Sequence, residues 1–111
     1  MLDRYKAGMV LSAVGDALGY RNGAWEFNMS GKEIHKELEI LGGLHKITVS
    51  LPNWKVSDDT VMHIATAEAL VTNKMVGEDL FLEIVGKYIS ACKTDMNGRL
   101  PGMALWGQYS S

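Results

Sequence analysis

Two adjacent carboxylates flanked by two hydroxyls are the side chains of this sequence best suited to chemistry. They form the run Ser57-Asp58-Asp59-Thr60, called the 57–60 segment below, which directly precedes an alanine-rich apolar stretch. Carboxylate and hydroxyl oxygens are the ligands that hard cations such as Mg²⁺ prefer. The same residues also suit a helix start, because serine caps helices and acidic residues in the first turn complement the helix dipole. The segment therefore indicates a helix cap, half of a metal site, or both.

A metal site at this segment needs ligands from elsewhere in the protein. Neighbouring residues on a helix point about 100° apart, so one Asp pair cannot enclose an ion. Such a pair can, however, bridge two ions that lie roughly 3.5–4 Å from each other. Residue types alone thus provide at most one side of a two-metal centre.

Three other charged residues stand out. Glu26 lies between two aromatic residues, where a surface acid is the simpler interpretation. Asp16 interrupts an apolar helix face, and a buried carboxylate is costly unless it is paired, so we expect it to cap or tether another group. Arg99 lies in a glycine- and proline-containing loop that offers backbone amides and a guanidinium to an anion, although an ordinary turn after a helix is the simpler interpretation of the loop by itself.

The elements that must position these residues are helices. Apolar spacing predicts helices over about residues 3–18, 32–41, 57–73 and 78–96, with residues 44–51 as an extended loop. In the first helix, Met9, Val10, Ala13, Val14 and Ala17 are spaced for one buried face, and Gly19 is the expected end. The fourth helix has the clearest amphipathic pattern: Leu80, Phe81, Ile84, Val85, Tyr88, Ile89 and Cys92. Four helices and no strands predict an all-α class.

Composition excludes several classes of protein. A chain of 111 residues fits one small domain, and its 47% hydrophobic content argues against disorder. A formal charge of −2 gives no basic field for nucleic acid or an anionic membrane. The sequence has no stretch of the roughly 18 apolar residues that a membrane span requires. A single cysteine, Cys92, cannot form an internal disulfide, so we expect a reducing, cytoplasmic compartment.

Several segments together resemble a known family. They are residues 9–20, Asn22-Gly23, Trp25-Glu26-Phe27, residues 57–70, Gly98-Arg99 and Pro101-Gly102. In this order and spacing they resemble the ADP-ribosyl-acceptor hydrolase family, most closely its ADP-ribosylarginine hydrolase branch. The resemblance covers about residues 4–102, and the 57–70 run is its most specific part.

The resemblance implies an all-α, compact multi-helix fold with two Mg²⁺ ions. The implied reaction removes ADP-ribose from arginine on proteins by N-glycosidic hydrolysis, so ADP-ribosylated arginine proteins or ADP-ribose are the expected partners. By resemblance, the metal residues are Ser57, Asp58, Asp59 and Thr60, and the substrate-binding residues are Gly98, Arg99, Pro101 and Gly102. Glu26 matches an acidic residue near the metal and the ribose. One of Asp58, Asp59 and Glu26 would take the proton of the attacking water, and which one does so stays open.

The sequence also departs from the family. Family members are much longer and carry a second acidic metal-binding motif near their C-terminal end, which nothing in residues 103–111 matches. We therefore expect residues 1–102 to be the N-terminal part of the family domain, residues 103–111 to be a divergent tail, and the truncated chain to have low or no activity. The alternative is a non-enzymatic fragment that regulates the full enzyme or binds a partner.

Overall fold

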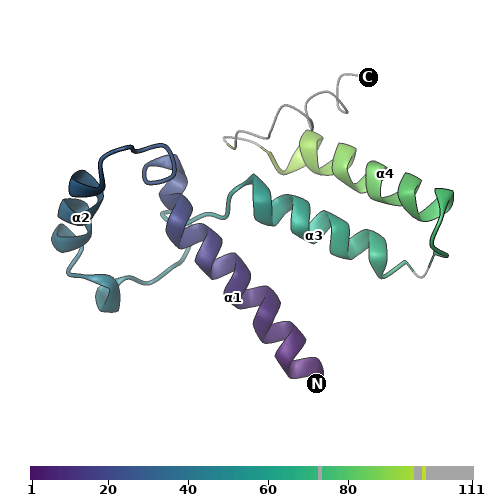
Figure 1. Ribbon diagram of the computed structural model, residues 1–111, viewed down its shortest axis with the longest axis horizontal. Coiled ribbons are helices and arrows are strands. Elements are labelled where there is room, and N and C mark those ends of the chain that lie inside the picture. Colours follow the sequence, from purple (N-terminus) through teal and green to yellow (C-terminus); the bar gives the residue numbers. More distant parts are fainter. Residues whose placement is uncertain (73, 97–98, 100–111) are drawn as a thin grey trace. The chain divides into compact units, whose positions relative to one another are not determined.

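The structure, a computed structural model, describes residues 1–72, 74–96 and 99 of the chain (Figure 1). Its elements are α1 (Leu2–Tyr20), the 3₁₀ turn η1 (Arg21–Gly23), α2 (Gly31–Ile40), the 3₁₀ turn η2 (Leu44–Lys46), α3 (Asp58–Leu70) and α4 (Glu78–Thr94). These described residues contain no strand, which confirms the all-α prediction. The predicted tail, residues 103–111, lies outside them.

The chain divides into two compact units, Met1–Ser57 and Asp58–Ser111. No helix within the described residues is long and apolar enough to cross a membrane.

The first helix ends later than its glycine predicts. It continues through Gly19 to Tyr20, and Arg21 ends it with a φ of 48°, donating its backbone N–H to the carbonyl of Ala17. Asn22 follows with a φ of 53°. Left-handed backbone costs a non-glycine residue about 1–2 kcal/mol. The side chains of Arg21 and Asn22 offset this cost, because both hydrogen-bond to the loop at residues 52–55.

A cluster of aromatic and charged side chains holds the first unit together. Trp54 is only 8% exposed, and its ring meets that of Trp25 edge-on, with centroids 5.6 Å apart. The guanidinium of Arg21 lies 4.3 Å from the centre of the Trp54 ring. Glu37 on α2 accepts hydrogen bonds from Trp25 Nε1 at 2.8 Å and from Arg21 Nε at 3.2 Å. This cluster joins α2 and the loop before α3 to the end of α1.

The prediction that one face of α1 is buried is wrong for most of the helix. Met9, Val10 and Val14 are exposed, Val10 by 61%, whereas Ala17 is buried. Burial in α1 is confined to Ala17 and Tyr20, next to the cluster around Trp54. Apolar spacing shows which side of a helix is suited to packing, but it does not supply the element that covers it.

In the second unit, α3 and α4 form an antiparallel helical hairpin (Figure 1). Buried alanines occur on both helices: Ala65 and Ala69 on α3, and Ala91 on α4. Such small side chains allow helix axes to approach closely, as their spacing on α3 predicts. The hydroxyls of Thr66 and Tyr88 add a hydrogen bond of 2.6 Å between the two helices.

The amphipathic prediction for α4 is correct for most of the helix but not for Phe81. Ile84, Val85, Tyr88 and Ile89 are half-buried, whereas the Phe81 side chain is 63% exposed. Phe81 lies in the first turn of α4, close to the connection from α3. An ion pair of 2.8 Å between Lys74 and Glu83 links that connection to the helix.

Cys92 lies half-buried on α4, and burial raises the pKa of its thiol. The thiolate is the form that reacts with alkylating agents. We therefore expect iodoacetamide at pH 8 to modify Cys92 more slowly in the folded chain than in the urea-unfolded chain. The raised pKa also means that folding stability falls as the pH rises above the unfolded value of about 8.5. Equal alkylation rates in the two states would contradict this burial.

Candidate functional site

The 57–60 segment lies at the start of α3. Helix α3 begins at Asp58, so Ser57 occupies the position directly before it and both aspartates lie in the first turn. Ser57 is 1% exposed and Thr60 is 6% exposed, while Asp58 is half-buried and Asp59 is exposed. The segment is a helix start, as predicted.

Asp16 tethers Ser57, as its place on an apolar helix face predicted. Asp16 Oδ2 accepts the backbone N–H of Ser57 at 2.9 Å, and Oδ1 accepts the Ser57 hydroxyl at 2.7 Å. Short hydrogen bonds to a carboxylate are among the stronger ones in proteins. The residue before the aspartate pair is thus held by both its main chain and its side chain.

Asn22 holds the loop that leads to Ser57. Its Nδ2 donates to the carbonyls of Asn53 at 2.7 Å and Pro52 at 3.3 Å, and its Oδ1 accepts the N–H of Lys55 at 3.0 Å. Arg21 Nη1 adds a bond of 3.0 Å to the carbonyl of Asn53. By residue type, Arg21-Asn22-Gly23 indicates a turn and nothing about this loop. The available signal was a polar pair directly after a helix, where asparagine adopts left-handed backbone more readily than most residues.

Glu26 lies in the connection between η1 and α2 and is exposed. It belongs to the unit Met1–Ser57, whereas Asp58 and Asp59 belong to the other unit. Its predicted place beside the metal and the ribose therefore stays a prediction.

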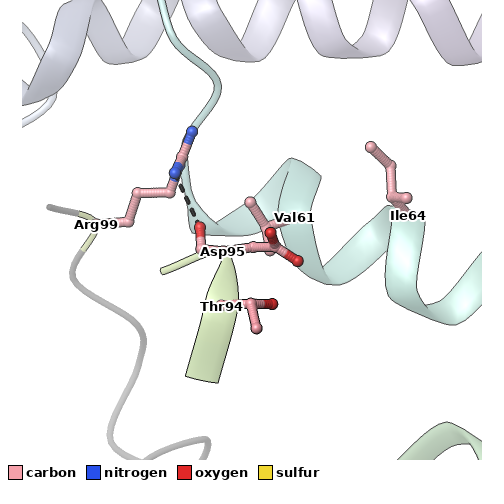
Figure 2. A pocket seen from close by; sticks show the side chains of 5 residues that line it. All are labelled: Val61, Ile64, Thr94, Asp95 and Arg99. Atoms are coloured by element: carbon pink, nitrogen blue, oxygen red, sulfur yellow. Dashed lines mark hydrogen bonds between the residues drawn. The ribbon is translucent and has the colours of Figure 1, made fainter. Parts of the chain in front are cut away.

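Arg99 lines an open pocket in the second unit. The pocket, of ≈ 390 Å³, is formed by Val61 and Ile64 of α3 together with Thr94, Asp95 and Arg99 (Figure 2). Arg99 Nη1 donates to the main-chain carbonyl of Asp95 at 2.8 Å. The other predicted substrate-binding residues, Gly98, Pro101 and Gly102, lie outside the described residues.

This pocket combines an apolar wall with charged groups. Val61 directly follows Thr60, so one wall of the pocket continues the helix that the 57–60 segment starts. A guanidinium presents planar N–H groups that match phosphate oxygens, and an apolar wall suits an adenine or ribose face.

The donors of the 57–60 segment fit Mg²⁺ in kind. All four side chains offer oxygen, and Mg²⁺ in proteins is often bound by one or two carboxylates with several waters. Within residues 1–72, 74–96 and 99, no three His, Cys, Asp or Glu side chains lie close enough together to hold a metal ion. In the described part of the chain, the segment therefore provides a short oxygen-rich donor set rather than a closed cage.

Comparison with known proteins identifies relatives of this chain. The family model for ADP-ribosylglycohydrolase matches residues 1–107. ADP-ribosylhydrolase ARH1 of Dictyostelium discoideum is 42% identical over 102 residues, which cover 91% of this chain and 26% of that protein. Protein L444 of Acanthamoeba polyphaga mimivirus, provisionally named an ADP-ribosyl glycohydrolase, is 33% identical over 100 residues, covering 79% of this chain and 19% of that protein.

The chain thus spans about a quarter or less of the length of these curated relatives. The match nevertheless extends over nearly all of its own residues, and the all-α structure agrees with it. On this ground the chain belongs to the ADP-ribosylglycohydrolase family.

Proposed function

We propose that this chain contributes one side of a Mg²⁺-dependent centre that hydrolyses the N-glycosidic bond between ADP-ribose and arginine on proteins. The observation that carries the proposal is the 57–60 segment, an oxygen-rich helix start whose first residue is anchored by Asp16. Membership of the ADP-ribosylglycohydrolase family supports the reaction class. The arginine specificity and the metal rest on the sequence resemblance, and the single cysteine supports a cytoplasmic location.

The proposal gives each residue a role. Ser57, Asp58, Asp59 and Thr60 would hold Mg²⁺. When bound, the ion would orient the substrate and supply positive charge that stabilises the negative charge developing on the oxygen of the attacking water. Glycosidic cleavage develops oxocarbenium character at the anomeric carbon. A carboxylate of Asp58, Asp59 or Glu26 would take the proton of the attacking water. As the C–O bond to water forms, the C–N bond would break, its electron pair would stay on the arginine guanidino nitrogen, and that nitrogen would take up the proton.

The proposed substrate-binding residues would contact the diphosphate of ADP-ribose. The guanidinium of Arg99 would pair with diphosphate oxygens, with Gly98, Pro101 and Gly102 forming the rest of the loop. The pocket that Arg99 lines beside Val61 and Ile64 supports this role.

We further propose that the 111-residue chain alone turns over little substrate. Removing one side of a two-metal clamp removes several kcal/mol of charge stabilisation, and about 4 kcal/mol corresponds to roughly a thousandfold slower reaction. The chain corresponds to 26% of the length of the Dictyostelium hydrolase, which supports this expectation.

Two assays test the proposal together. One measures binding of ADP-ribose to the chain, and the other measures hydrolysis of ADP-ribosylated arginine. With Mg²⁺ in excess, we expect the chain to bind ADP-ribose, Arg99→Ala to weaken that binding, and hydrolysis to be at least about a thousandfold slower than by the Dictyostelium hydrolase. Turnover by the chain that Asp59→Asn abolishes would contradict the incomplete site. Binding of Mg²⁺ without any binding of ADP-ribose would instead favour a helical metal-binding domain with no role in ADP-ribose chemistry.

One observation favours the alternative, a non-enzymatic fragment that binds a partner. Helix α1 exposes large apolar side chains, among them Leu2, Tyr5, Val10 and Leu11. A helix surface of this kind is typical of an interaction face. Pull-down with the intact Dictyostelium hydrolase tests it. Failure to associate, together with a monomeric chain in size-exclusion chromatography, would count against this function.

A further inference from the structure

Asp16 is a half-buried carboxylate that has no role in the proposed mechanism. It is half-buried on α1, and both of its oxygens receive hydrogen bonds from one residue, Ser57. Ser57 is itself 1% exposed and is one of the four proposed metal residues. The pair lies wholly within the unit Met1–Ser57.

The direction of these bonds bears on what the Ser57 hydroxyl can do. A hydroxyl has one proton to donate and two lone pairs. Asp16 Oδ1 accepts the proton at 2.7 Å, which fixes the rotamer of the side chain and the direction in which its lone pairs point. The second bond, from the Ser57 N–H to Oδ2 at 2.9 Å, fixes the main chain at the same residue. Carboxylates that orient a ligand by hydrogen bonding are a regular feature of metal sites.

We propose that Asp16 is a positioning residue, which sets the orientation of the Ser57 hydroxyl toward a divalent cation held by the 57–60 segment. This inference rests on the proposed metal function. Asp16 acts only through Ser57 and does not itself touch the ion. Its effect on cation binding therefore depends on the Ser57 hydroxyl being present.

The loop before Ser57 supports the same role. Four hydrogen bonds from Arg21 and Asn22 hold the main chain between Pro52 and Lys55. Ser57 therefore approaches Asp16 from a backbone that is already fixed two residues earlier. Because this backbone is already ordered, cation binding at Ser57 has a smaller cost in conformational entropy.

The first experiment measures the Ser57 side chain without metal. Three-bond NMR couplings at Ser57 report its χ1 rotamer. We expect one rotamer in the natural chain, averaging between rotamers in Asp16→Ala, and partial recovery in Asp16→Glu, which restores the carboxylate. Retained amide protection in α2, which belongs to the same unit as Asp16 and Ser57, confirms that this unit is folded in each variant. A single unchanged rotamer in Asp16→Ala would overturn the inference.

The second experiment is a double-mutant cycle in Mg²⁺ affinity, read from Mg²⁺-dependent amide shifts of the full chain. Loss of an orienting partner typically weakens metal affinity about 10- to 100-fold. We expect Asp16→Asn and Ser57→Ala each to weaken Mg²⁺ binding about tenfold, and the double variant to be no weaker than Ser57→Ala alone. Ser57→Ala removes only a hydroxyl and keeps the N–H, so the cycle stands even if Asp16→Ala does not fold.

The outcomes separate this inference from the proposed function. Additive losses in the cycle, or an Asp16→Asn variant with natural affinity while Asp59→Asn has none, would overturn the positioning role and leave the metal site in place. A natural chain with no response to Mg²⁺ would overturn the metal proposal and the positioning role with it.

Discussion

Replacing Trp54 with alanine is expected to lower the free energy of unfolding of the unit Met1–Ser57 by about 3 kcal/mol or more. Trp54 is the largest buried side chain of that unit, meets Trp25 edge-on, and carries the Arg21 guanidinium on its ring. Its loss removes both interactions and leaves a cavity. A urea titration followed at the indole N–H signal of Trp25, which bonds to Glu37, measures the change in this unit alone.

Phe27 provides the matched control for this prediction. It is an aromatic residue of the same unit but is 58% exposed. Phe27→Ala is expected to change the free energy of unfolding by no more than about 0.5–1 kcal/mol, as exposed substitutions usually do. If the two variants are equally stable, Trp54 is not the centre of the first unit.

Asp59→Asn is expected to weaken Mg²⁺ binding by more than about 100-fold, beyond the usual effect of losing an orienting partner. The substitution keeps the shape of the side chain but removes the anionic oxygen that the cation prefers. Isothermal titration of the folded variant with Mg²⁺ measures the loss.

Asp79 offers a matched control within the same chain. Glu78 and Asp79 form a second acidic pair in the first turn of a helix, but without flanking hydroxyls. A helix-dipole role predicts similar, small stability losses of about 0.3–1 kcal/mol for Asp59→Asn and Asp79→Asn. Only a metal role predicts that Mg²⁺ affinity falls in the first variant alone. Equal Mg²⁺ affinity in the two variants would show that the aspartate pair acts only as a helix cap.

Local patterns predicted the elements of this fold well. The four helices were expected near their observed positions, because apolar spacing and capping residues act over a few neighbouring positions. The helix start at the 57–60 segment and the stop after α2, where Gly42 and Gly43 adopt positive φ, follow from the same local chemistry. The tether role of Asp16 was predictable from the cost of burying an unpaired carboxylate.

Long-range contacts explain what the sequence left unpredicted. The end of α1 at Arg21 depends on bonds to Glu37 and to the loop around Asn53, 16 and 32 residues away. The central position of Trp54 likewise depends on which residues meet it. For α1, apolar spacing identified side chains suited to burial, but in this chain Val10 and Leu11 are exposed. The place of Arg99 in a pocket with Val61 and Ile64 could not be predicted from spacing alone.

The most direct test of the account is a Mg²⁺ titration of the natural chain, followed residue by residue by NMR. We predict saturable shifts concentrated at the amides of Ser57, Asp58, Asp59 and Thr60, with little change at the acidic start of α4. Shifts that are equal at the two helix starts, or that grow linearly without saturation, would contradict a metal site at the 57–60 segment.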